Sequence, residues 1–206
     1  MLASAAVVYD PWEDGRRARG RRTRESILAT AADIASVEGL EGLTIGRLAT
    51  ELRMSKSGLF AHFGSKEELQ IATNAAARER FVTTVIAPTE ALPPGRERLQ
   101  RLVDGWLAYL RDGVFAGGCY FTTVRVEFDA RDAGAVRDEI AADQRAWLER
   151  LTREVRGAFD DAVDAEQLAF EIDVTGMGAN VQYQLLRDPA VFDRAARALA
   201  ARFDAP

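Results

Sequence analysis

Apolar side chains recur at helical spacing along most of the chain after residue 22. In the stretch RTRESILATAADIASVEGL, Ile27, Ala31 and Ile34 are three or four residues apart, so they would share one face of a helix. Runs in which apolar and polar residues alternate, as they do in half-buried strands, are nearly absent. The pattern therefore predicts an all-α protein.

Residues that favour helix ends divide this pattern into nine predicted helices. Gly39 is placed to end the first helix, while Thr44, Ser55 and Ser65 are placed to cap the N-termini of the next three. The sequence SKEE, which starts at Ser65, also matches the S-x-x-E capping box of a long helix over about 66–86. After a break rich in proline, the pattern predicts helices that end near residue 113, lie within 119–130, and span 136–159, 165–186 and 189–203.

Two short predicted helices lie next to each other within residues 44–62 and are separated by a tight turn at Arg53 and Met54. This is the arrangement of a helix-turn-helix, whose second helix enters the major groove of DNA. Ser55, Lys56 and Ser57 place side-chain donors beside the backbone N–H groups of that helix start, where a phosphate or a base edge would lie. The stretch therefore predicts a DNA-binding surface.

Charge is distributed unevenly along the chain. The 206 residues carry a formal net charge of −5, which argues against indiscriminate coating of nucleic acid or of an anionic membrane. Residues 16–66, however, hold ten basic and five acidic side chains, whereas residues 67–206 hold 17 basic and 24 acidic ones. A basic region followed by an acidic one indicates that one end of the molecule meets a polyanion.

Several classes of protein are disfavoured by the sequence. The single cysteine, Cys119, excludes an internal disulfide framework and is more simply a small core residue than a redox sensor. The opening MLASAAVVYD lacks the basic region of a secretory signal, and no apolar run is long enough for a membrane helix, so we expect a cytoplasmic protein. We find no catalytic triad, phosphate-binding loop or dinucleotide motif, and the lone His62 makes a poor metal site, so we expect no catalysis, metal or cofactor.

The stretch TIGRLATELRMSKSGLFAHFGSKEEL resembles the DNA-binding signature of the TetR family of transcriptional repressors, and the resemblance covers about residues 22–70. It implies an N-terminal three-helix head and a six-helix body for ligand binding and dimerisation. We therefore expect a flexible basic arm over 1–20, a helix-turn-helix DNA-binding domain over 21–66 and a ligand-binding and dimerisation domain over 67–206.

The resemblance also implies roles for individual side chains at the DNA. The expected DNA-binding residues are Arg22, Thr23, Thr44, Arg53, Ser55, Lys56, Ser57, Phe60, His62 and Lys66. Phe60 stands where the family often has Tyr, so a hydroxyl contact to phosphate would be missing. Arg53 stands where Gly is common, so it either strains a left-handed backbone position or adds a positive contact, and we favour the contact.

For the body, the resemblance implies a homodimer on a pseudo-palindromic operator and an unknown small-molecule effector that relieves repression. The expected interface residues, on the last two helices, are Phe170, Val174, Val181, Leu185, Phe192, Leu199 and Phe203. The expected ligand-binding residues are Trp106, Tyr109, Phe121, Thr122, Phe128, Trp147, Met177, Asn180 and Gln184.

Two alternatives to the ligand-responsive repressor remain open on the sequence. One is an enzyme or carrier that a DNA-binding head targets, which turnover of a pocket ligand would support. The other is a DNA-binding regulator with a filled core and no effector, which a body without a sizeable cavity would support.

Overall fold

The structure is a computed structural model, and it describes residues 11–132, 134–159 and 163–204, with side chains from Ala18 onward. The helices are, in chain order, α1 (Pro11–Gly42), α2 (Ile45–Leu52), α3 (Lys56–Phe63), α4 (Lys66–Phe81), α5 (Arg96–Asp112), α6 (Tyr120–Phe128), α7 (Ala135–Ala158), α8 (Ala165–Leu186) and α9 (Ala190–Asp204). Between α4 and α5 lie a π-helical turn, η1 (Val82–Ile86), and a 3₁₀ turn, η2 (Ala87–Thr89). No strand occurs in these three ranges, which confirms the predicted all-α class.

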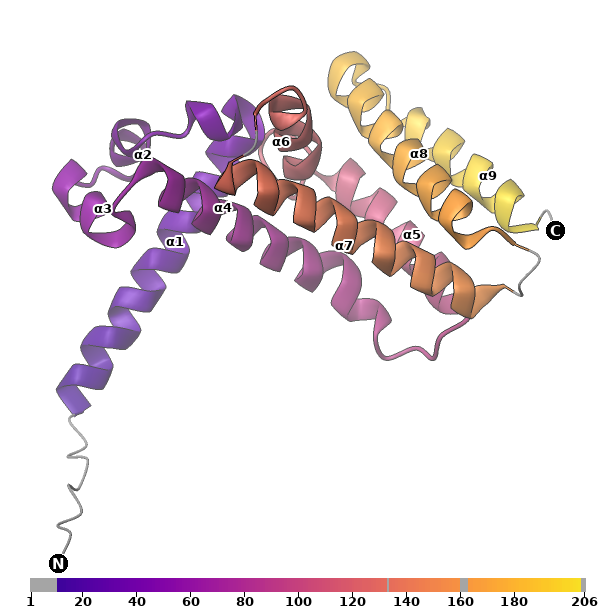
Figure 1. The fold of residues 1–206 in the computed structure, drawn as a ribbon, viewed down its shortest axis with the longest axis horizontal. Helices are drawn as coiled ribbons and strands as arrows, with labels where there is room; N and C mark the ends of the chain where they lie inside the picture. Colours follow the sequence, from indigo (N-terminus) through magenta and orange to yellow (C-terminus); the bar gives the residue numbers. More distant parts are fainter. Residues whose placement is uncertain (1–10, 133, 160–162, 205–206) are drawn as a thin grey trace, which may run out of the picture.

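The helices form a small head and a larger body (Figure 1). α2 and α3 lie together at one end of the molecule, beside α1, whose first turns project away from the other helices. α4 runs from the head into the body, where it packs against α7, and α8 and α9 form a pair at the opposite end. α4 therefore connects the two regions mechanically.

Side-chain caps start three of the first four helices where the sequence predicts them. The backbone N–H of Arg47 donates to Thr44 Oγ1 at 3.0 Å, and the N–H of Gly58 donates to Ser55 Oγ at 3.1 Å. The N–H of Glu68 donates to Ser65 Oγ at 3.0 Å, which is one half of the predicted capping box. Each cap satisfies a backbone donor that the helix itself leaves without a partner.

The start of α1 differs from the prediction. α1 begins at Pro11 and not near residue 22, so residues 11–20 are helical where we expected an irregular arm. Proline is favoured at the first position of a helix, and the arginines that follow have high helix propensity, which outweighs the cost of the two glycines. The rest of the predicted arm, residues 1–10, lies outside the described residues. Gly39 ends the regular helix as predicted, because its φ of 76° is in the left-handed region.

Hydrogen bonds join the head to the body between α1 and α6. The Glu127 carboxylate accepts the backbone N–H groups of Leu40 at 2.7 Å and Glu41 at 2.8 Å. Thr123 Oγ1 donates to the carbonyl of Ser36 at 3.1 Å, one turn earlier on α6. The end of α1 is thus held by side chains of a helix in the body.

None of the described helices is both long enough and apolar enough to cross a bilayer.

Candidate nucleic-acid interface and ligand cavity

The first turn of α3 presents polar side chains to solvent. Ser55, Lys56 and Ser57 are exposed, and Phe60 on the next turn is 54% exposed. The inner face of the same helix is fixed in the core by Leu59 and by Phe63. The packing of α3 therefore leaves its N-terminal polar side chains exposed to solvent, as a major-groove helix requires.

The turn between α2 and α3 places Arg53 in a left-handed conformation, with φ 52° and ψ 38°. Its N–H closes the end of α2 on the carbonyls of Ala49 and Thr50. A non-glycine residue in this region costs about 1–2 kcal/mol, so the strained position that we considered is present. The Arg53 side chain is exposed, so it is accessible for the predicted contact with DNA.

Four other predicted DNA-binding residues have partners within the chain. The Lys66 ammonium pairs with the Glu41 carboxylate at 2.8 Å, and this hydrogen bond lowers the pKa of Glu41 below its usual range. Thr23 Oγ1 donates to the carbonyl of Arg19, and Arg22 Nε donates to that of Ala18, along the exposed side of α1. The half-buried His62 holds α1 to α3 through its carbonyl, which accepts from the Arg24 guanidinium at 3.0 Å.

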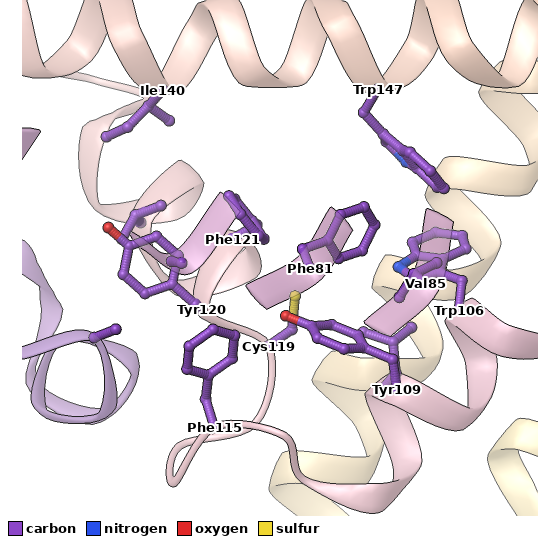
Figure 2. Close-up of a cluster of buried hydrophobic side chains, with 14 of the residues drawn as sticks. Phe81, Val85, Trp106, Tyr109, Phe115, Cys119, Tyr120, Phe121, Ile140 and Trp147 are labelled. Carbon is purple, nitrogen blue, oxygen red and sulfur yellow. The ribbon is translucent and has the colours of Figure 1, made fainter. Parts of the chain in front are cut away.

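A cavity of about 120 Å³ lies in the body between α4, η1, α5, α6, α7 and α8. Four aromatic side chains contribute to its wall: the ring of Phe81 lies 5.6 Å from that of Phe121 and 5.2 Å from that of Trp147, and Trp106 lies 5.2 Å from Trp147. Figure 2 shows these rings and Cys119 converging from four segments of the chain. A closely similar volume, about 150 Å³, is enough to hold benzene in an engineered apolar cavity.

One buried carboxylate organises the polar side of this cavity. Asp173, on α8, accepts hydrogen bonds from Trp147 Nε1 at 2.9 Å and from Gln144 Nε2 at 2.9 Å. Arg125 Nη1 lies 3.5 Å from Asp173 Oδ1 and 2.9 Å from the sulfur of Met177. The three helices α6, α7 and α8 are therefore joined by one hydrogen-bonded cluster beside the cavity.

The other two arginines at the cavity have closer carboxylate partners. Arg78 pairs with Asp143 at 2.7 Å, which raises the pKa of the guanidinium. Arg150 Nε lies 2.8 Å from Glu154, and Arg150 Nη1 lies 3.1 Å from Glu90. The shortest guanidinium–carboxylate distance of Arg125, 3.5 Å to Asp173, is therefore longer than that of either of the other two arginines that line this space.

The structure brings five of the nine predicted ligand-binding residues to the cavity: Trp106, Phe121, Thr122, Trp147 and Met177. The other four lie elsewhere. Tyr109 is buried beside Phe81 and Phe115, and burial raises the pKa of its hydroxyl, so this side chain stays neutral. Phe128 lines a separate shallow hollow, Asn180 is buried away from the cavity, and Gln184 lies against Gly118 and accepts from Arg187.

The sequence reasoning missed Phe81, the polar residues Arg78, Arg125, Asp143 and Arg150, and the η1 residues Val82 and Ile86. A signal for Arg125 was present, because this charged residue follows Phe121 by four positions and Thr122 by three on a short apolar helix. A similar signal marks Arg78, which precedes Phe81 by three positions and Val82 by four. Arg150 has no such signal, because its helix face also carries Arg153 and Glu154.

An apolar strip lies exposed along the outer side of α8. Phe170, Val174, Val181 and Leu185 are spaced so that they share one face, and their exposed fractions run from 44% to 79%. Leu186, which the sequence reasoning did not select, is also exposed. We call these five residues the α8 strip.

The predicted interface residues on α9 are in a different environment. Phe192, Leu199 and Phe203 are at most 6% exposed, because α9 turns its apolar face toward the protomer's own core. Phe192 packs on Tyr183, and Phe203 packs on Phe159. These three residues are buried within the single chain, so of the seven predicted interface residues Phe170, Val174, Val181 and Leu185 are the exposed ones.

These features define a helical regulator with a helix-turn-helix head and a body that contains a cavity, and comparisons with known proteins specify the class. Residues 27–73 match the family model described as bacterial regulatory proteins of the tetR family, and residues 95–199 match the tetracyclin repressor-like C-terminal domain. The chain therefore belongs to the TetR family of transcriptional regulators, as its signature suggested.

Individual relatives agree with this assignment. The chain is 30% identical over 105 residues to the HTH-type transcriptional regulator TcmR of Streptomyces glaucescens, a match that covers 50% of this chain and 45% of TcmR. The match thus spans less than half the length of that relative. A TetR transcriptional regulator from Chloroflexus aurantiacus has the same fold with a TM-score of 0.78 and 26% identity, over 91% of this chain and 96% of that one. AibR, solved with isovaleryl coenzyme A and operator DNA, has a TM-score of 0.64 and 21% identity, over 87% of this chain and 96% of its own.

Proposed function

We infer that this regulator is a homodimeric, ligand-responsive repressor that binds a pseudo-palindromic operator. The observation that carries the inference is the exposed N-terminal turn of α3, where Ser55, Lys56 and Ser57 surround a helix start whose dipole attracts anions. Residues of this kind position a recognition helix on phosphates and reach base edges.

The α8 strip supports the dimer. Large side chains in a contiguous exposed row are costly in water, and a two-fold axis would let the same strip on two copies bury itself. Such a dimer would place two α3 helices on one side of the DNA, with half-sites about 34–36 Å apart. The operator would accordingly read as an inverted repeat.

The cavity supports a small-molecule effector, and α6 provides a route from it to the head. Thr122 and Arg125 line the cavity, while Glu127 on the same helix holds the backbone of Leu40 and Glu41 at the end of α1. A ligand that moved α6 would strain these two hydrogen bonds and so favour another position of the head. A coupling of about 1–3 kcal/mol would change operator affinity by roughly 5- to 150-fold, and DNA would weaken ligand binding by the same factor.

The first test is selection of bound sequences from random duplex DNA by the purified protein, with the winning sequences measured again at two salt concentrations. An inverted-repeat consensus that binds far above random DNA would support the proposal. Weak binding that is independent of sequence and falls steeply with salt would contradict it, because phosphate contacts alone behave in this way.

A further inference from the structure

A buried hydroxyl and a half-buried guanidinium at the cavity point to the chemistry of its ligand. Thr122 Oγ1 is buried and, in the described part of the chain, has no hydrogen-bond partner. Arg125 lies one helical turn away on α6, and its side chain is 18% exposed. Since residues three apart on a helix share a face, a hydroxyl donor and a guanidinium meet the cavity side by side.

The partners of Arg125 leave it short of acceptors. Its Nη1 contacts the Met177 sulfur, and a thioether is a weak acceptor. Its nearest carboxylate, Asp173, is 3.5 Å away and already accepts from Trp147 and Gln144. A second carboxylate at this point would therefore give the guanidinium the charge-assisted hydrogen bonds that the chain itself supplies poorly.

The aromatic side chains of the cavity wall favour a ligand whose carboxylate is attached to an aromatic ring. Phe81, Phe121 and Trp147 present ring faces and edges to the space, and the volume of about 120 Å³ suits a single ring. We propose that the effector is a monocyclic aromatic carboxylate whose ring lies among these three side chains and whose carboxylate binds Arg125 and Thr122. This inference rests on the proposed function, because it names the ligand class of the same cavity.

The test compares an acid with a neutral molecule of the same shape. Phenylacetate and phenylacetamide would be titrated into the full-length protein without DNA and followed by ligand-observed NMR. We expect phenylacetate to bind at least about tenfold more tightly than phenylacetamide, since hydrogen bonds to charged groups contribute more than neutral ones. Because no DNA is present, failure here is separate from failure of the operator selection.

Substitutions test which side chains cause the preference for phenylacetate over phenylacetamide. Arg125→Gln should abolish the tenfold preference, Arg125→Lys should keep part of it, and Thr122→Val should weaken phenylacetate binding by about threefold to tenfold. Arg111→Gln, on the exposed end of α5, is the matched control and should change nothing. Equal affinity for acid and amide, retention of the full preference by Arg125→Gln, or no binding of either probe would overturn the proposal.

Discussion

The helix-turn-helix and the ligand cavity differ in the way their polar groups are satisfied. In the head, Thr44, Ser55 and Ser65 cap the helix starts from within the chain, and Lys56 and Ser57 face solvent. In the cavity, Thr122 Oγ1 is buried without a partner among the described residues, and Arg125 Nη1 donates to the Met177 sulfur, which is a weak acceptor. The helix starts of the head are therefore satisfied without DNA, whereas a ligand of the proposed kind would supply hydrogen bonds that the cavity lacks. A ligand that uses these groups shifts an equilibrium between two conformations only if it binds one conformation more tightly than the other.

The largest expected effect comes from the α8 strip, on which the presentation of two heads depends. Val181→Asp would place a charge at each of two symmetric positions of a dimer, at a cost of about 2 kcal/mol or more each. We expect monomers in analytical ultracentrifugation and a loss of operator affinity on the order of 100- to 1,000-fold. Val126→Asp, at an exposed valine on α6, is the control and should stay dimeric. If the Val181→Asp protein remained dimeric, the dimer interface would have to lie elsewhere on the molecule.

The next effect is on stability, where head and body meet. A Cβ at Gly117 would overlap the backbone carbonyl of Ser36, whose hydroxyl accepts the Gly117 N–H at 2.9 Å. Gly117→Ala should lower the free energy of unfolding by about 1–3 kcal/mol, as overpacking does. Urea denaturation measures this. Gly20→Ala, at an open position on α1, should leave stability equal or raise it by up to about 1 kcal/mol. Equal stability of the two variants would show that α1 and α6 adjust freely to each other.

A third prediction concerns the different contributions of two lysines of the head to operator binding. Lys56 is exposed, whereas Lys66 is held by Glu41, so Lys56→Ala should weaken operator binding more than Lys66→Ala. We expect a loss of about 1–3 kcal/mol for Lys56→Ala if it reads a base, or a salt slope smaller by about one if it meets a phosphate. Fluorescence anisotropy at several salt concentrations measures both quantities. An unchanged affinity and slope would remove Lys56 from the interface.

The smallest expected effect concerns the connection between the two sites. Glu127→Gln keeps one acceptor oxygen but loses the carboxylate that holds both Leu40 and Glu41. The coupling between effector and operator should fall by about 0.5–1.5 kcal/mol, the contribution of a typical hydrogen bond, while ligand affinity without DNA stays the same. Ligand titrations with and without operator measure the coupling. Full coupling in the variant would show that the two Glu127 hydrogen bonds do not transmit the effect of the ligand.

The head was largely predictable from sequence, because its determinants are local. Caps at Thr44, Ser55 and Ser65 and the ends at Gly39 and Gly64 act within one turn of the residues that specify them. The pairing of Lys66 with Glu41 was not predictable, because the two residues are 25 positions apart and meet only when α4 packs against the end of α1.

The cavity was predictable only in part, for the same reason. Aromatic residues at helical spacing were expected in the body, yet which of them face the space depends on how six segments pack. The pairing of Arg125 with Asp173 was not predictable, because the two residues are 48 positions apart in the sequence. The apolar faces of α8 and α9 were both recognisable, but amphipathicity does not say whether a face meets its own core or another molecule, so Phe192 and Val181 look alike in sequence and differ in the fold.

Gly176 has a consequence for how this protein can change over generations. A side chain there would overlap the Trp106 indole, so the absent methyl group lets one wall of the cavity lie against α8. The same helix carries the α8 strip on its opposite side. A lineage that acquires a new effector by exchanging residues around position 176 therefore edits the helix that would also join its two subunits. If the proposed function holds, ligand preference and subunit pairing are inherited together in one segment of 22 residues.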